Sequence, residues 1–311
     1  MNRAALRPVP SAMRLLFALA LCAAIPGRAA ATLNVVTTTE GLGALAREVG
    51  GDRVRVETLS RGIQDPHFVD PNPTLAVKLR NADLLVDVGL ELEVGWLPPL
   101  VNQSRNPDIQ VAGSRRLAAS SAVVVLEVPT GPVDRSQGDI HPSGNPHFLS
   151  DPRRAEKVAA AIAAKLTQLD PAGAAYYAGR LAEFRKKLDA AISRWRAELA
   201  PVRGTTVVTH HNSLTYLLDF AGMGAAGYLE PKPGITPPPA HLADLVGIVR
   251  AGGVHAILLE NYYDRKAADL VGRLTGAKVE VIPGDVGGSK DASDYFSYVD
   301  LLVRALVQAK G

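Results

Sequence analysis

The stretch "VVTHHNSLTYLLDFAG" (residues 207–222) has a β-branched run, a short polar turn and then a helical pattern of apolar residues. The stretch "VVTTTEGLGALAREVG" (35–50) has the same order and opens with the same three letters. A strand, a turn and an amphipathic helix form the repeating unit of parallel α/β proteins. Its occurrence in both halves of the 311-residue chain predicts two similar α/β lobes.

The same alternation of strands and helices continues outward from both stretches. Short β-branched or apolar runs indicate buried strands, and apolar residues at helical spacing indicate the helices between them. The expected strands are 33–39, 53–60, 83–90, 205–211, 255–261 and 277–284, and the expected helices are 40–50, 73–82, 151–170, 213–222, 265–276 and 294–310.

A long helical pattern, "PAGAAYYAGRLAEFRKKLDAAISRWRAELA" (171–200), lies between the halves, with Pro171 near its first turn. A helix is stiffer than a Gly/Ser linker, so the lobes should move little. We therefore expect an α/β fold of two lobes, each a parallel sheet with flanking helices, joined by one long rigid helix. The expected divisions are an N-terminal lobe at 32–170, a linking helix at 171–201 and a C-terminal lobe at 202–311.

Residues 1–31 have the features of a cleaved secretory signal peptide. Three arginines precede the apolar run Leu15–Ile25, which is too short to span a bilayer, and small residues follow at Ala29–Ala31. Removing this segment takes away four Arg and no acidic residue, so the net charge changes from +3 to −1. A basic surface for nucleic acid is therefore not expected. Cys22, the only cysteine, is also removed, so a transition-metal site must use His and carboxylates. We expect an exported protein without a transmembrane segment.

Several of the seven histidines stand beside predicted strand ends or loops. His67, His147 and His211 do so, and Asp285 follows the predicted strand at 277–284. In open α/β sheets, ligand-binding groups gather at the carboxyl ends of strands. Taken singly, each residue has a plainer explanation, since a lone loop histidine is usually solvated or holds a turn. Their long separations match no short metal-binding motif.

The order of several blocks resembles the metal-specific solute-binding proteins of ABC importers (zinc/manganese type, cluster A-I). The blocks are "QDPHFVDPNPTLAVKLRNADLLVDVGLELE" (64–93), "GNPHFLSDP" (144–152), "THHNSLTYLLDFAG" (209–222), "GITPPPAHLADLVGIVRAGGVHAILLEN" (234–261) and "PGDVGGSKDASDYFSYV" (283–299). Together they cover essentially the whole chain after the signal peptide. This resemblance implies a metal site of His67, His147, His211 and Asp285 in a cleft between the lobes.

Three neutral imidazoles and one carboxylate suit tetrahedral Zn(II). Relatives that handle manganese tend to have Glu in place of the third His, whereas this chain keeps His211. The stretch 112–146, however, lacks the long His/Asp/Glu-rich loop of many zinc-specific relatives, so Mn(II) stays open as an alternative. A closed site with four ligands leaves no position for an activated water, which argues against hydrolysis.

Three further residues near these blocks have competing interpretations. His210 and His211 point to opposite faces if both lie on a strand, so His210 is expected to have a structural role or to orient a ligand. His141, six residues before His147, is expected to hold a turn, with metal capture as the alternative. Glu260 could be a ligand instead of Asp285, but it is expected to cap the next helix or pair with a base.

The resemblance implies a periplasmic, monomeric protein that captures Zn(II) and delivers it to an ABC-transporter permease and its ATPase, without catalysis. A periplasmic metal chaperone could be a further partner. The alternatives are a manganese-specific solute-binding protein, a metal-dependent adhesin, a periplasmic zinc chaperone and a zinc hydrolase.

Overall fold

The computed structural model describes residues 32–131 and 141–310. The predicted signal peptide, residues 1–31, lies outside the described residues. From Thr32 onward the chain folds as one compact unit. In the described part of the chain, no helix is both long and apolar enough to cross a membrane.

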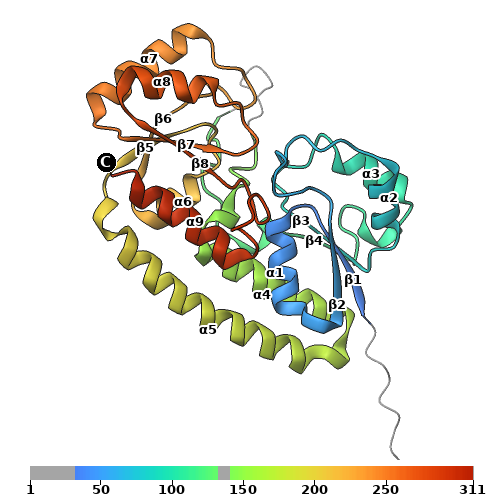
Figure 1. The fold of residues 1–311 in the computed structure, drawn as a ribbon. Coiled ribbons are helices and arrows are strands. Elements are labelled where there is room, and N and C mark those ends of the chain that lie inside the picture. The colour runs from blue at the N-terminus through green and yellow to red at the C-terminus, as the bar shows by residue number, and fades with distance from the viewer. Residues whose placement is uncertain (1–31, 132–140, 311) are drawn as a thin grey trace, which may run out of the picture. The chain divides into compact units, whose positions relative to one another are not determined.

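Two parallel sheets of four strands form the framework (Figure 1). In each sheet the first strand in sequence pairs with the second on one side and with the third on the other. The N-terminal sheet has the order β2-β1-β3-β4, with β1 Leu33–Thr37, β2 Val54–Thr58, β3 Leu84–Asp87 and β4 Arg116–Ala118. The C-terminal sheet has the order β6-β5-β7-β8, with β5 Thr206–Thr209, β6 Gly224–Tyr228, β7 Ala256–Glu260 and β8 Lys278–Ile282. The matching orders agree with the similarity between the two halves of the sequence.

Most of the helices lie between these strands in the sequence, and the last helix follows the last strand. They are α1 Glu40–Gly50, α2 Pro73–Arg80, α3 Leu97–Ser104, α4 Pro152–Leu169, α5 Ala174–Leu199, α6 Thr215–Ala221, α7 Pro239–Gly252, α8 Lys266–Thr275 and α9 Tyr295–Gln308. The sequence sets several of their starts. The side chains of Asn72 and Asp151 accept hydrogen bonds from the first turns of α2 and α4, and a proline follows each cap.

The long linking helix is α5, which is flanked by short 3₁₀ turns at Pro171–Gly173 and Ala200–Val202. Its 26 residues span about 39 Å. It packs against α4, α1 and α9 (Figure 1). The largest apolar cluster runs through these helices and reaches both sheets, from Val35 in β1 to Val207 in β5. The predicted fold of two parallel sheets with flanking helices and a long helix between them is confirmed.

Two strands that complete the sheets have no clear signal in the sequence. Strand β4 has only three residues, and β6 has the sequence Gly-Ala-Ala-Gly-Tyr without a β-branched residue. Both lie at a sheet edge, where pairing with one neighbour defines the strand more than side-chain propensity does. The predicted lobe boundaries at 170 and 201 stay a prediction.

Candidate metal centre

Three of the histidines singled out from the sequence come together. His67 lies in the loop after β2, His147 immediately before the turn that leads into α4, and His211 two residues after the end of β5. The imidazole centroids are 5.2 Å apart for His67 and His147, 5.3 Å for His67 and His211, and 5.2 Å for His147 and His211. The carboxyl ends of strands from both sheets therefore contribute to one cluster of imidazoles.

A fourth imidazole, that of His141, belongs to the same cluster. Its Nε2 lies 3.2 Å from Nε2 of His67. Within residues 32–131 and 141–310, one group of three potential ligand atoms lies within 4.8 Å of one another, and it consists of His67, His141 and His147. The backbone of His141 also makes a turn, because its carbonyl accepts a hydrogen bond of 3.0 Å from the amide of Gly144. The expected turn role thus describes the backbone, while the side chain contacts the cluster.

Asp285 lies apart from that group and is held by backbone amides. Its Oδ2 accepts a hydrogen bond of 2.9 Å from Gly41 at the start of α1, and its Oδ1 accepts one from Val286. Burial raises the pKa of Asp285 to about 6, although these amides act in the opposite direction. Asp285 and His147 both line a small cavity of about 70 Å³. The carboxyl group is therefore next to the cluster but turned toward the N-terminus of α1.

Two carboxylates orient the outer nitrogens of two imidazoles. Nδ1 of His67 is 2.7 Å from Asp65, and Nδ1 of His211 is 3.0 Å from Glu230. A carboxylate at Nδ1 favours the tautomer with a proton there, which leaves Nε2 free to bind a metal. Burial acts to lower the pKa of His211, but the hydrogen bond and charge of Glu230 outweigh it and the pKa is raised. The pKa of Glu230 falls to about 2, because its hydrogen bonds to His210 and His211 outweigh burial.

The other two imidazoles favour the neutral form. Burial, followed by the charges of His67 and His211, lowers the pKa of His141 to about 4 and that of His147 well below its usual value. Nε2 of His147 is buried and has no hydrogen-bond partner among the described residues. A buried nitrogen without a partner is costly unless something else binds it. This chemistry suits a metal cation.

His210 faces away from the imidazole cluster. Its ring stacks on Tyr263 at a centroid distance of 3.9 Å, and its Nε2 lies 3.4 Å from Glu230. Both histidines lie beyond β5, which ends at Thr209, so strand alternation does not set their directions. His210 nevertheless contacts the carboxylate that orients His211. Glu260, the last residue of β7, neither caps a helix nor pairs with a base among residues 32–131 and 141–310. Its Oε1 accepts a hydrogen bond from Ser213 instead.

A larger cavity of about 390 Å³ opens beside the cluster. His141, His147 and His211 all contribute to its wall, together with the carboxylates of Glu127 and Glu230. Lys232 also lines this cavity, so its wall carries two carboxylates and one ammonium group. His147 lines both this cavity and the small cavity beside Asp285.

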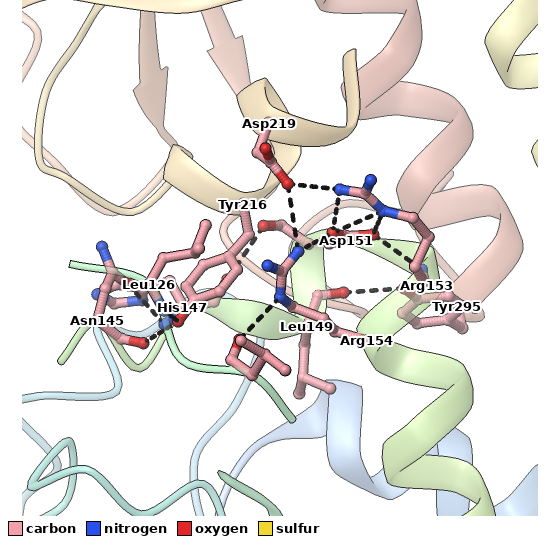
Figure 2. A network of polar contacts seen from close by, with 12 residues as sticks. Leu126, Asn145, His147, Leu149, Asp151, Arg153, Arg154, Tyr216, Asp219 and Tyr295 are labelled. Atoms are coloured by element: carbon pink, nitrogen blue, oxygen red, sulfur yellow. Dashed lines mark hydrogen bonds and ion pairs between the residues drawn. The ribbon is translucent and has the colours of Figure 1, made fainter. Parts of the chain in front are cut away.

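The segment that carries His147 is anchored by a network of polar contacts (Figure 2). The fully buried side chain of Asp151 caps α4 and forms ion pairs with Arg153 and Arg154. Both arginines also reach Asp219 in α6, and the guanidinium of Arg154 lies 4.5 Å from the ring centroid of Tyr216. This network ties the start of α4 to α6, which follows the loop of His211.

The sequence profile of a family described as "ZnuA: Zinc-uptake complex component A periplasmic" matches residues 35–309. The chain belongs to this family. Similarity to the zinc-binding lipoprotein AdcA of Streptococcus pneumoniae is 24% identity over 89% of this chain, but that match spans only 55% of AdcA. The zinc uptake protein ZnuA of Bacillus subtilis is 24% identical over 88% of this chain and 85% of its own length. A crystal structure of ZnuA superposes with a TM-score of 0.77 at 21% identity, covering 90% of this chain and all of that one.

The family is described as a periplasmic component of zinc uptake. The family resemblance inferred from the sequence blocks is thereby confirmed. Sequence reasoning singled out three of the four clustered imidazoles but not the orienting carboxylates. Asp65 stands only two residues before His67, so its closeness in the sequence could have indicated that it orients this histidine. Glu230 lies 19 residues beyond His211, and only the pairing of β5 with β6 brings the two together.

Proposed function

We propose that this protein captures Zn(II) in the periplasm and delivers it to an ABC-transporter permease and its ATPase. The observation that carries the proposal is the cluster of four imidazoles, two of which have a carboxylate at Nδ1. The export signal expected at residues 1–31 and the ZnuA family membership support the same function.

The proposed ligands are His67, His147, His211 and Asp285. The imidazoles of the first three lie at mutual centroid distances near 5 Å, which suits one metal ion between them. Asp285 requires a rotation away from Gly41 to present an oxygen. With one carboxylate and three neutral imidazoles, the centre retains about one positive charge, which Asp65 and Glu230 offset from outside.

His141 is a second candidate for the fourth position, because its Nε2 already lies 3.2 Å from that of His67. Two nitrogens at this distance can bind the same ion, since Zn–N bonds are about 2.0–2.1 Å long. Zn(II) is favoured over Mn(II) by a site dominated by imidazole, because Mn(II) prefers oxygen ligands. With four protein ligands, no position remains for the activated water that a zinc hydrolase needs.

Competitive titration of the purified protein tests this proposal. We expect one Zn(II) per chain, with much weaker binding of Mn(II). His67→Ala, His147→Ala and His211→Ala should each lower the Zn(II) affinity by orders of magnitude. Comparing Asp285→Ala with His141→Ala then identifies the fourth ligand, because only its removal should weaken binding by a comparable factor. A wild-type affinity in the His211 variant would refute the ligand set.

Delivery to a permease is tested in cells. A strain that depends on this protein for zinc uptake should lose that uptake when His147 is replaced. The adhesin and chaperone alternatives predict unchanged uptake. Sedimentation of the purified protein tests the proposed monomeric state.

A further inference from the structure

The side chain of Asn145 connects the two segments that carry His147 and His211. Asn145 is 7% exposed and stands two residues before His147. Its Oδ1 accepts a hydrogen bond of 2.9 Å from the backbone amide of His147. This contact fixes the turn at His147, as Asn side chains commonly do in turns.

The amide nitrogen of the same side chain reaches the other segment. Nδ2 of Asn145 donates a hydrogen bond of 2.8 Å to the carbonyl of Asn212, the residue that follows His211. It donates a second of 2.9 Å to Oε2 of Glu127. Both amide hydrogens and the oxygen are therefore used, so the orientation of this side chain is fixed.

Glu127 and Tyr216 complete the bridge. Oε2 of Glu127 also accepts a hydrogen bond of 2.7 Å from Nδ2 of Asn212, so one carboxylate oxygen binds both asparagines. The hydroxyl of Tyr216 donates to the carbonyl of Asn145 at 2.6 Å and accepts from the amide of Leu126 at 2.9 Å (Figure 2).

The backbone of Glu127 indicates that this arrangement is held against a local cost. Its φ of 54° lies in the left-handed region, which is uncommon for residues other than glycine. Such backbone persists where surrounding contacts hold it, and it concentrates at functional sites. Here the contacts are those of its own carboxylate with Asn145, Asn212 and Thr215.

We infer that Asn145 is a positioning residue that sets the separation between His147 and His211 and thereby the coordination geometry of the bound metal. The two rings lie 5.2 Å apart at an interplanar angle of 83°. His147 and His211 come from segments 64 residues apart in the sequence, and the Asn145 side chain joins those segments within two residues of each ring. This inference rests on the proposed metal centre.

The test compares Asn145→Ala with Asn106→Ala as a matched control. Asn106 is a second buried asparagine, 9% exposed, whose Nδ2 donates to the carbonyls of Leu79 and Ala82 in the N-terminal lobe. Both variants should lose some thermal stability. Only Asn145→Ala should lower the Zn(II) affinity, by about 10- to 100-fold, which is typical when a residue that orients a ligand is removed.

The visible absorption spectrum of the Co(II)-substituted protein gives a readout that stability alone does not move, because the band energies and intensities report the ligand geometry. We expect a changed spectrum for Asn145→Ala and a wild-type spectrum for Asn106→Ala. Asn145→Asp serves if the alanine variant fails to fold. It keeps the acceptor for the His147 amide but sets a second oxygen against Glu127 and the Asn212 carbonyl, so it should change the spectrum as well.

The possible outcomes separate this inference from the proposed function. If the wild-type protein binds neither Zn(II) nor Co(II), the proposed function fails and the inference fails with it. If the wild-type protein binds both ions and Asn145→Ala keeps its spectrum and affinity, only the positioning role is overturned. A change of spectrum in Asn106→Ala equal to that of Asn145→Ala would also overturn it, because the effect would then be structural.

Discussion

Glu230 should control both the strength and the pH dependence of metal binding through its contact with His211. Glu230→Gln nearly preserves shape and removes the negative charge. The carboxylate is 9% exposed, lies 3.0 Å from Nδ1 of His211 and accepts a hydrogen bond of 3.1 Å from Gly234. Loss of such an orienting carboxylate typically lowers metal affinity about 10- to 100-fold, or about 1.4–2.7 kcal/mol.

The sign of the pH effect follows from the pKa of His211, which Glu230 keeps above its usual value. Metal binding requires the neutral imidazole, so protons compete with the metal at every pH below that pKa. Below it, the apparent affinity falls about tenfold per pH unit for this one proton. Removing the charge of Glu230 lowers the pKa of His211, so the fall begins at a lower pH in the variant.

The affinity ratio between wild type and Glu230→Gln should therefore be greatest near pH 8 and shrink as the pH falls toward 5.5. Competition with a chromophoric chelator of known affinity, measured at several pH values, gives this ratio. His210→Ala is the control, since it leaves the contact between Glu230 and His211 in place. A ratio that stays constant with pH, or an unchanged affinity at pH 8, would refute the reasoning.

Three further predictions concern the network around the site and the core. His210→Ala should change the Zn(II) affinity only slightly in the same titration, because His210 contacts Glu230 rather than the cluster; a loss as large as that of His211→Ala would make it a ligand. Asp151→Ala should lower the free energy of unfolding in urea by about 1–2 kcal/mol, because it removes the cap of α4, while Arg153 and Arg154 keep their ion pairs with Asp219; an unchanged free energy of unfolding contradicts this. Phe184→Ala, in the core between α5 and α9, should cost about 3–5 kcal/mol and leave zinc affinity intact in the folded protein; weaker zinc binding would instead couple this packing to the site.

Local sequence indicated most of the elements and their order, although α3 and α7 are not among the expected helices. The apolar spacing, the β-branched runs and caps such as Asp151 before Pro152 depend on neighbours in the chain, so the predicted elements are found close to their expected bounds. The edge strands β4 and β6 could not be predicted, because their extended structure depends on a pairing partner distant in sequence.

The sequence also identified His67, His147 and His211, through strand ends and through blocks that resemble a known family. It could not show that the side chain of His141 joins them, because the segment's turn residues say nothing of where its imidazole points. Nor could it show that the carboxylate of Asp285 accepts a hydrogen bond from Gly41 at the start of α1 instead of contacting the imidazole cluster.

Tertiary structure alone decided the contacts that tune the site. Glu230 reaches His211 because β6 pairs with β5, and Asn145 reaches Asn212 because α4 and α6 are held together by Arg153, Arg154 and Asp219. Each contact joins residues distant in the chain, and its direction depends on the packing of whole elements. The sequence thus determined which groups are available to bind a metal, and the fold determined their distances, orientations and charge, because these depend on packing between segments far apart in the chain.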